Sequence, residues 1–150
     1  MQTFDPVQFH ITPLQVPLFE IDLGQAVYHG NYYHFYNQAR DAFLREAGFP
    51  YKRLMELERH LAIVELNTRF RQSLRYDDEI EVETGVSWWR SRSIGMVQRI
   101  HRLEENGERS LCNEATFSMV CVDFSGRAVI LPEQLLERLQ GWISTNGGKN

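Results

Sequence analysis

The stretch from Glu20 to Gly48 constrains the fold most, because it joins a polar, glycine-containing loop to a long amphipathic segment. The apolar residues of that segment recur every three or four positions, at Tyr32, Phe35, Tyr36, Ala39, Phe43 and Ala47. This spacing places their side chains on one face of a helix roughly 25 Å long. Gly48 and Pro50 follow, as is typical just past a helix C-terminus. The sequence therefore predicts a helix over 32–47 with a buried face and a site at its N-terminus.

Much of the remaining chain alternates apolar and polar residues with a period of two, which is typical of half-buried strands. The pattern predicts strands over 61–71, 79–88, 94–103 and 111–122, after a short first strand over 16–21. Pro6 and Pro13 indicate that residues 1–14 are irregular. Residues 51–60 are predicted to form a short helical connector, and Pro132 is predicted to open a last helix.

An antiparallel sheet of this length cannot leave its apolar face in water, and the helix over 32–47 is long enough to cover it. We therefore expect an α+β fold, in which an antiparallel sheet of about five strands wraps around one long central helix. The last four strands are expected in meander order, and a short helix closes the chain. The 150 residues are expected to form one domain over 1–150, with about 1–13 and 144–150 peripheral and a disordered NGGKN tail.

Charge and composition narrow the classes of function. A net charge of -4 argues against a nucleic-acid binder, which would show a basic face. No apolar run is long enough to span a membrane, and the N-terminus does not resemble a signal peptide. Cys112 and Cys121 lie in one predicted strand and cannot bridge within it, and no histidines have the spacing of metal ligands. We therefore expect a cytoplasmic protein that needs no metal.

Three separate stretches resemble the hotdog-fold acyl-CoA thioesterases, and most closely the branch of 4-hydroxybenzoyl-CoA thioesterases and YbgC-like proteins. The first is DLGQAVYHGNY over 22–32, with AR at 39–40 and FL at 43–44 of the predicted helix. The second is ELNTRF over 65–70 with YDDEIEV over 76–82, and the third is CVDFSGR over 121–127 with ILPE over 130–133. The three stretches occur in the same order and spacing as in the family, so the resemblance covers residues 14–140.

The resemblance implies a hotdog fold and hydrolysis of a CoA thioester without metal or cofactor. It also implies homodimers that join their sheets edge to edge, with two active sites at the interface, and dimers that often pair into tetramers. On the family pattern, the catalytic carboxylate is Asp22. The backbone N–H that polarises the thioester carbonyl lies near His29.

This assignment suits the chemistry. Hydrolysis needs an activated water or nucleophile, and Asp22 is suited to act as a general base or to attack the carbonyl directly. Free N–H groups at a helix N-terminus suit the negative charge that develops on the carbonyl oxygen. The alternative for Asp22 is a loop residue that makes only local hydrogen bonds.

The loop departs from the family pattern at one position. Members usually have glycine three residues after the aspartate, where this chain has Gln25, with Gly24 just before it. We expect either a loop that bends differently or a Gln25 side chain that reaches into the site.

The remaining candidates are for binding. Tyr28 is a candidate for the acyl pocket, while Asn31 stands where an N-cap belongs and is also a candidate for substrate contact. Arg90, Ser91 and Arg92 form a bend whose cations suit the phosphates of CoA, although surface arginines are common. Two rival functions remain, a thioesterase for acyl-carrier protein and a non-catalytic acyl-CoA-binding module.

Overall fold

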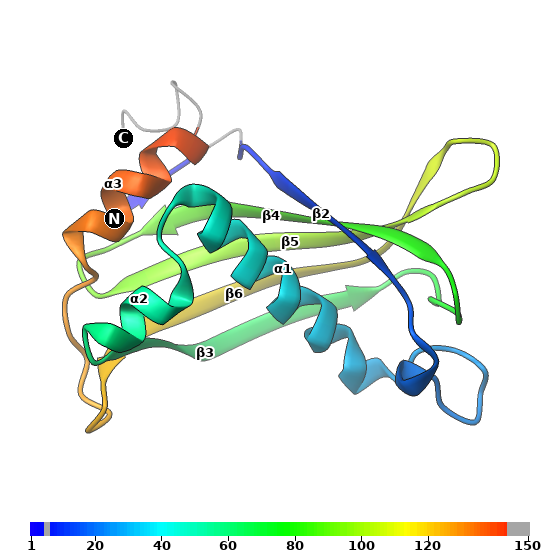
Figure 1. Cartoon of the computed structure of the whole chain (residues 1–150), viewed down its shortest axis with the longest axis horizontal. Helices are drawn as coiled ribbons and strands as arrows, with labels where there is room; N and C mark the ends of the chain where they lie inside the picture. Colours follow the sequence, from blue (N-terminus) through cyan, green and yellow to red (C-terminus); the bar gives the residue numbers. More distant parts are fainter. Residues whose placement is uncertain (5–6, 144–150) are drawn as a thin grey trace.

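The computed structural model describes residues 1–4 and 7–143, and the expectations for the tail lie outside the described residues. The strands are β1 (Gln2–Thr3), β2 (His10–Gln15), β3 (Arg59–Phe70), β4 (Glu79–Trp89), β5 (Ser93–Leu103) and β6 (Arg109–Asp123). The helices are α1 (Tyr32–Ala47), α2 (Tyr51–Glu56) and α3 (Glu133–Leu139), with 3-10 turns η1 (Leu18–Glu20), η2 (His29–Asn31) and η3 (Gln140–Trp142). Figure 1 shows their arrangement, with α1 lying across one face of the sheet.

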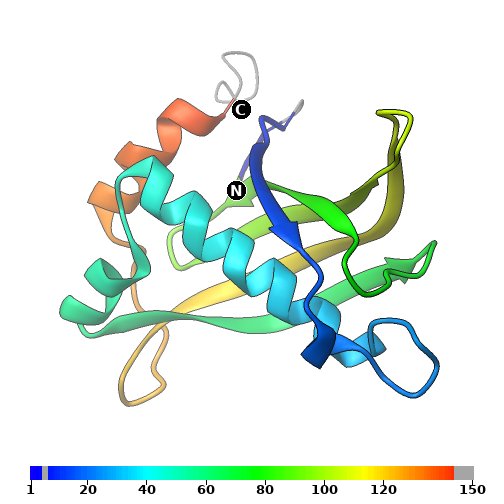
Figure 2. The same cartoon turned by 45° about the vertical axis from the view of Figure 1, so that its right-hand side comes forward.

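The prediction for the central helix is confirmed, because α1 spans Tyr32–Ala47. Gly48 follows it with a φ of 90°, a left-handed conformation that glycine adopts without a Cβ penalty. The N–H of Phe49 then donates to the carbonyl of Leu44 at 2.9 Å and closes the helix end. The hydrophobic stripe faces the sheet, and Figure 2 shows α1 lying in the concave curve of the strands.

The expected α+β architecture is confirmed with a sheet of six strands, although the order of the strands differs from the prediction. The sheet runs β1-β4-β5-β6-β3, with β2 also paired to β4, and each pairing is antiparallel. Among the described strands, only β4, β5 and β6 form a meander. β3 pairs with β6, so residues 71–78 carry the chain across the sheet to β4. The expected meander of four strands was wrong because periodicity shows which face a side chain occupies but not which strand lies beside it.

The first strand also lies elsewhere than predicted. The sequence predicted irregular residues up to 14 and a strand over 16–21, whereas β2 spans His10–Gln15 and residues 18–20 form η1. Residues 10–13 therefore belong to the sheet. Pro13 is tolerated because β2 pairs with β4 alone among the described strands, and an edge strand needs ladder hydrogen bonds on one side only.

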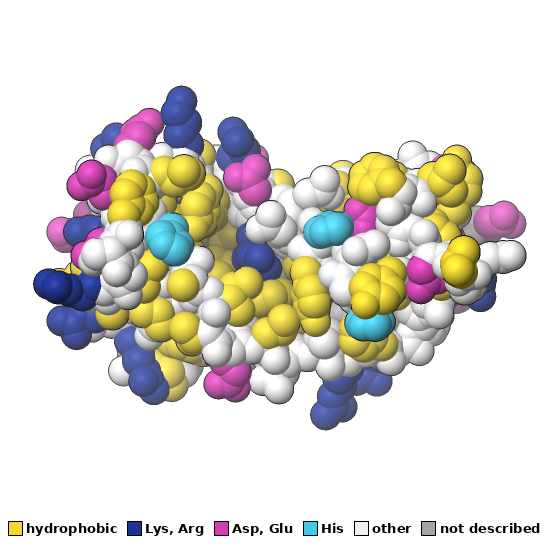
Figure 3. Space-filling view, turned by 90° about the horizontal axis from the view of Figure 1, so that it is seen from below, with side chains coloured by type: hydrophobic (Ala, Val, Ile, Leu, Met, Phe, Trp, Pro, Cys, Tyr) yellow, Lys and Arg dark blue, Asp and Glu magenta, His cyan; other side chains and the backbone are white. Residues whose placement is uncertain are grey.

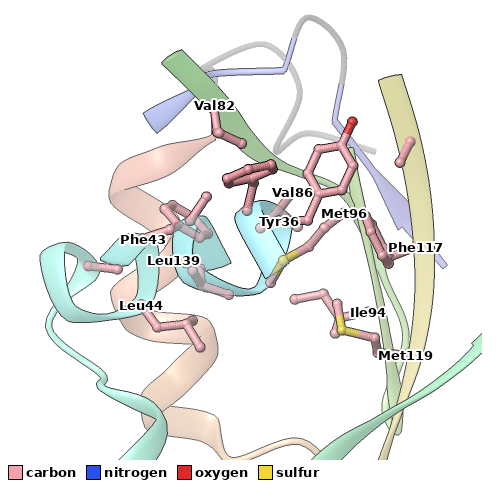
Figure 4. Packing of buried hydrophobic residues seen from close by; sticks show 14 of the residues in the cluster. Tyr36, Phe43, Leu44, Val82, Val86, Ile94, Met96, Phe117, Met119 and Leu139 are labelled. Carbon is pink, nitrogen blue, oxygen red and sulfur yellow. The ribbon is translucent and has the colours of Figure 1, made fainter. Parts of the chain in front are cut away.

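The core lies between α1 and the sheet, closed at one end by α3. Its packing is shown in Figure 4, where Tyr36, Phe43 and Leu44 of α1 face Met96, Phe117 and Met119 of the strands. A polar network runs through this core, because the buried Tyr36 hydroxyl donates to Oδ1 of the buried Asn113. In the described part of the chain, no helix is both long and apolar enough to cross a membrane.

Candidate active site

The loop between η1 and η2 is folded tightly on itself and holds Asp22 at its start. An isolated antiparallel bridge joins Ile21 to Val27, and the Asp22 N–H donates to the carbonyl of Ala26 at 3.0 Å. The Asp22 carboxylate accepts the N–H of Gly24 on Oδ1 at 2.8 Å. A Cβ on Gly24 would lie 3.1 Å from that same oxygen, so glycine permits this close approach. One carboxylate oxygen is thereby fixed by the turn.

Gln25 occupies a backbone conformation that explains the glycine of the family pattern. Its φ is 63°, in the left-handed region that glycine favours. The Gln25 N–H donates to the Asp22 carbonyl at 3.0 Å, so a tight turn over 22–25 forms with glutamine in place. The Gln25 side chain is exposed, and it does not line the cavity that Asp22 borders.

Glu20 anchors this loop to the helix, a role that sequence reasoning missed. Its carbonyl accepts the Tyr28 N–H and the Asn31 side-chain amide, each at 3.1 Å. Its carboxylate, only 4% exposed, lies 2.9 Å from Nδ1 of His34 in α1. Asn31 stands at the N-cap position of α1, as predicted, but its side chain makes no capping bond and donates to the Glu20 carbonyl instead. The signal that could have revealed Glu20 is an acidic residue that interrupts an apolar run, between Phe19 and Ile21.

The helical N-terminus begins at His29, because η2 runs directly into α1. The first helical hydrogen bond joins the Asn31 N–H to the Tyr28 carbonyl at 2.8 Å. The amides of His29 and Gly30 come before it, at the end of the helix where N–H groups lack helical partners and carry partial positive charge. The half-exposed Tyr28 ring packs on the His29 ring, with 4.3 Å between centroids.

One cavity of about 370 Å³ brings the two predicted catalytic residues together. It is lined by Asp22, Val27, His29, Tyr32, Phe70, Arg71, Gln72 and Ser73. Tyr28, Gln25 and Asn31 are not part of this lining. Asp22 and His29 therefore face a shared space from the two ends of one short loop.

The far wall of this cavity comes from the end of β3 and the residues after it, which the sequence did not single out. The Phe70 ring stands edge-on to the Tyr32 ring at 5.1 Å and to the His29 ring at 6.5 Å. Burial raises the pKa of Tyr32, so its hydroxyl stays protonated and accepts the Leu74 N–H at 3.3 Å. Phe70 closes the stretch 65–70 of the family resemblance, and its position there is the signal that could have found this wall.

Arg90, Ser91 and Arg92 lie at the opposite end of the sheet from Asp22 within one chain. They form the turn between β4 and β5, whereas the residue just before β4, Asp78, bonds the segment that leads to η1. At ~3.3 Å per residue, the length of β4 separates the two ends by roughly 35 Å. Nearer cations are Arg71, in the cavity lining, and Arg75 and Arg102, which border an adjacent hollow.

A match to a family model identifies the class of protein. The family model described as the thioesterase-like superfamily matches residues 16–139. The chain therefore belongs to the thioesterase-like superfamily, and the hotdog fold that the resemblance implied is confirmed.

Named relatives agree with this class. The acyl-CoA thioester hydrolase YbgC of Escherichia coli is 33% identical over 111 residues, which cover 74% of this chain and 80% of that protein. The acyl-CoA thioesterase YbgC of Haemophilus influenzae is 32% identical over 126 residues, 82% of this chain and 88% of that protein. A crystal structure of a 4-hydroxybenzoyl-CoA thioesterase variant with 4-hydroxybenzoyl-CoA has a TM-score of 0.80, over 88% of this chain and 99% of that chain. Because it is 22% identical, it supports the fold alone.

Proposed function

We propose that this chain is a thioester hydrolase that acts on acyl-CoA, with residues 1–150 forming one catalytic domain. The YbgC relatives are named for this activity. The observation that carries the proposal is that Asp22 and His29 line one cavity at a helix N-terminus. A carboxylate beside the free amides of a helix N-terminus is suited to thioester hydrolysis.

In this proposal, the thioester carbonyl oxygen accepts the backbone N–H of His29. The helix end stabilises the negative charge that develops on this oxygen. The free oxygen of the Asp22 carboxylate either removes a proton from the attacking water or attacks the carbonyl carbon itself. The departing CoA thiolate is a good leaving group, so the mechanism needs no further acid.

When the thioester is bound, the CoA moiety is expected to extend out of the cavity along the residues that follow β3. Arg71 borders the cavity, and Arg75 and Arg102 lie in the adjoining hollow. Within one copy of the protein, these arginines are therefore better placed than Arg90 or Arg92 to bind the phosphates of a CoA whose thioester lies in the cavity. The same cavity would serve the rival substrate, an acyl-carrier protein, through its phosphopantetheine arm. We place the enzyme in the cytoplasm, because Cys112 and Cys121 are free thiols, as is usual in a reducing compartment.

We also propose that two copies join through β3. This strand of 12 residues pairs with β6 on one side, and no other described strand pairs with it. It exposes apolar side chains along this edge, Ile63 at 46% and Val64 at 63%. An exposed apolar edge of this length is a template for pairing with another strand. Antiparallel pairing of two β3 strands would continue the sheet from one copy into the other.

Release of CoA thiol from a panel of acyl-CoA esters tests the catalytic proposal. The Asp22→Asn variant should lose activity by a factor of ~100 or more, because the amide can neither accept the proton nor attack. Glu133→Gln, a matched carboxylate-to-amide change at an exposed position of α3, should keep full activity. Full activity in Asp22→Asn, or no thiol release from any ester, would contradict the proposal. Tight binding of intact acyl-CoA without thiol release would favour the non-catalytic rival.

Sedimentation measurements test the proposed dimer. A lysine at position 64 would place a charge on each paired edge, so Val64→Lys should sediment as a monomer where the wild type is a dimer. Phe124→Lys places the same charge on an exposed apolar residue in the turn after β6 and should leave the dimer intact. A monomeric wild type, or a fully dimeric Val64→Lys variant, would refute pairing through β3.

A further inference from the structure

Arg40 is a half-buried cation that forms no ion pair with any of the described residues. It lies in the middle of α1, with its guanidinium 4.5 Å from the centroid of the Phe117 ring. Its Nη1 donates to Oε1 of Gln98 at 2.9 Å, and its Nη2 lies 3.4 Å from Oδ1 of Asn37. Within residues 1–4 and 7–143, no carboxylate forms an ion pair with it, since the adjacent Asp41 pairs with Arg45.

In this arrangement the charge of the Arg40 guanidinium is not paired with a carboxylate, and some of its N–H donors have no acceptor among the described residues. Burial lowers the pKa of Arg40 to about 10, so the side chain remains charged at neutral pH. A charge that is partly removed from water is less favourable unless hydrogen bonds or an opposite charge compensate it. The guanidinium has five N–H groups, and its contacts with Gln98 and Asn37 occupy only part of them. Gln98 is neutral and is itself held, because its side-chain amide donates to the Tyr36 carbonyl and the Thr84 hydroxyl.

The side chain of Arg40 borders a groove between α1 and the strands. The groove has a volume of about 490 Å³ and is lined by Asn37, Gln38, Arg40, Asp41, Leu44, Tyr51, Leu61, Ile63, Met96 and Met119. Arg40 is the only cation in this lining, and five of its neighbours there are aliphatic or methionine side chains. Figure 3 shows hydrophobic side chains around a hollow on this face, with a basic side chain visible within it. The groove therefore suits an apolar ligand that carries an oxygen acceptor.

In the proposed dimer, the groove of one copy lies next to the catalytic cavity of the second copy. Within one chain, Arg40 is 11 residues along the helix from His29, which is roughly 16 Å. β3 runs beside both sites, because its first half contributes Leu61 and Ile63 to the groove and its end contributes Phe70 to the catalytic cavity. Antiparallel pairing of β3 with its copy would set the end of one strand beside the start of the other. The groove of one copy would then continue the catalytic cavity of the other.

We propose that Arg40 is a specificity-determining residue that contacts the acyl group bound at the catalytic cavity of the second copy. It favours acyl groups that carry an oxygen acceptor, above all a carboxylate, beyond the thioester carbonyl. The inference rests on the proposed thioesterase function and on pairing through β3. The apolar lining holds the carbon skeleton, while the guanidinium binds the acceptor through a charge-assisted hydrogen bond.

The experiment compares CoA esters that differ only in the acceptor. Glutaryl-CoA is paired with pentanoyl-CoA, adipoyl-CoA with hexanoyl-CoA, and 4-hydroxybenzoyl-CoA with benzoyl-CoA, and kcat/KM is measured from released thiol. In at least one pair the wild type should prefer the ester with the acceptor. Arg40→Met should reduce that preference by roughly tenfold or more, and Arg40→Lys should retain part of it. Arg53→Met, the same change at an exposed position of α2, should leave the preference unchanged.

The outcomes separate this inference from the function on which it rests. If the wild type hydrolyses the esters through Asp22 but favours the unsubstituted member of every pair, the inference is wrong and the thioesterase proposal stands. If no ester is hydrolysed, the thioesterase proposal fails first. If Arg40→Met is monomeric where the wild type is dimeric, the guanidinium binds the second copy rather than the acyl group, and the inference is overturned. Should Arg40→Met not fold, the wild-type preferences and the Arg40→Lys variant decide.

Discussion

Replacing Gln25 with glycine should stabilise the protein. Gln25 has a φ of 63°, and a non-glycine residue in the left-handed region costs about 1–2 kcal/mol. Glycine removes this strain but adds about 0.5–1 kcal/mol of unfolded-chain entropy that folding must overcome. The Gln25 side chain is exposed and makes no hydrogen bond with the described residues, so the substitution removes no side-chain interaction. We therefore expect Gln25→Gly to raise the free energy of unfolding by about 0.5–1 kcal/mol, or the Tm by roughly 2 °C.

Urea unfolding and calorimetry would measure this gain, and the chain offers a control. Glu58, in the turn between α2 and β3, has a φ of 56° and is also exposed, so Glu58→Gly should give a similar gain far from the catalytic loop. Gln25→Ala keeps the strained conformation and should leave stability nearly unchanged. If Glu58→Gly stabilises but Gln25→Gly destabilises, the Gln25 side chain itself holds the loop, and the reasoning from backbone strain is refuted.

Two further predictions concern the core. Tyr36→Phe removes the hydroxyl that donates to the buried Asn113, so it should lower the free energy of unfolding by about 1–2 kcal/mol in urea titrations; an unchanged stability would contradict this. Burial between the rings of Phe43 and Trp142 lowers the pKa of His10, so the unfolded chain binds more protons than the folded one as pH falls below 6.5. Stability should therefore fall on acidification through that value, and His10→Phe should reduce this loss; an equal loss in the variant would refute the assignment.

The elements of this fold were largely predictable because their signals are local. The period of the apolar residues predicted α1 to its first and last residue, and the alternation in β4 and β5 matches the observed strands. The neighbour of β3 was not predictable from such a pattern, because pairing with β6 depends on contacts between residues far apart in sequence. β2 was missed for a related reason, since Pro13 breaks a regular pattern yet is tolerated on an edge that pairs on one side.

Some residues of the site were predictable from a local motif, whereas others come together only through tertiary packing. The loop motif predicted that Asp22 and His29 would act together, and both line one cavity. The wall that Phe70 and the residues after it provide depends on the crossing of the chain from β3 to β4, which no local pattern encodes. Arg40 belonged to the recognised motif, but its missing anionic partner is visible only once the side chains around it are placed.

The anchoring of the loop explains why glutamine can occupy the position of the usual glycine. The backbone of 22–25 is held from outside the turn, because the Ile21–Val27 bridge closes the loop and the Glu20 carbonyl binds Tyr28 and Asn31. The Glu20 carboxylate then ties these contacts to α1 through His34. Since these bonds fix both ends of the loop, they can hold one residue in the left-handed region at a cost of about 1–2 kcal/mol. The position of Asp22 relative to the helix N-terminus therefore depends more on Glu20 than on a glycine at position 25.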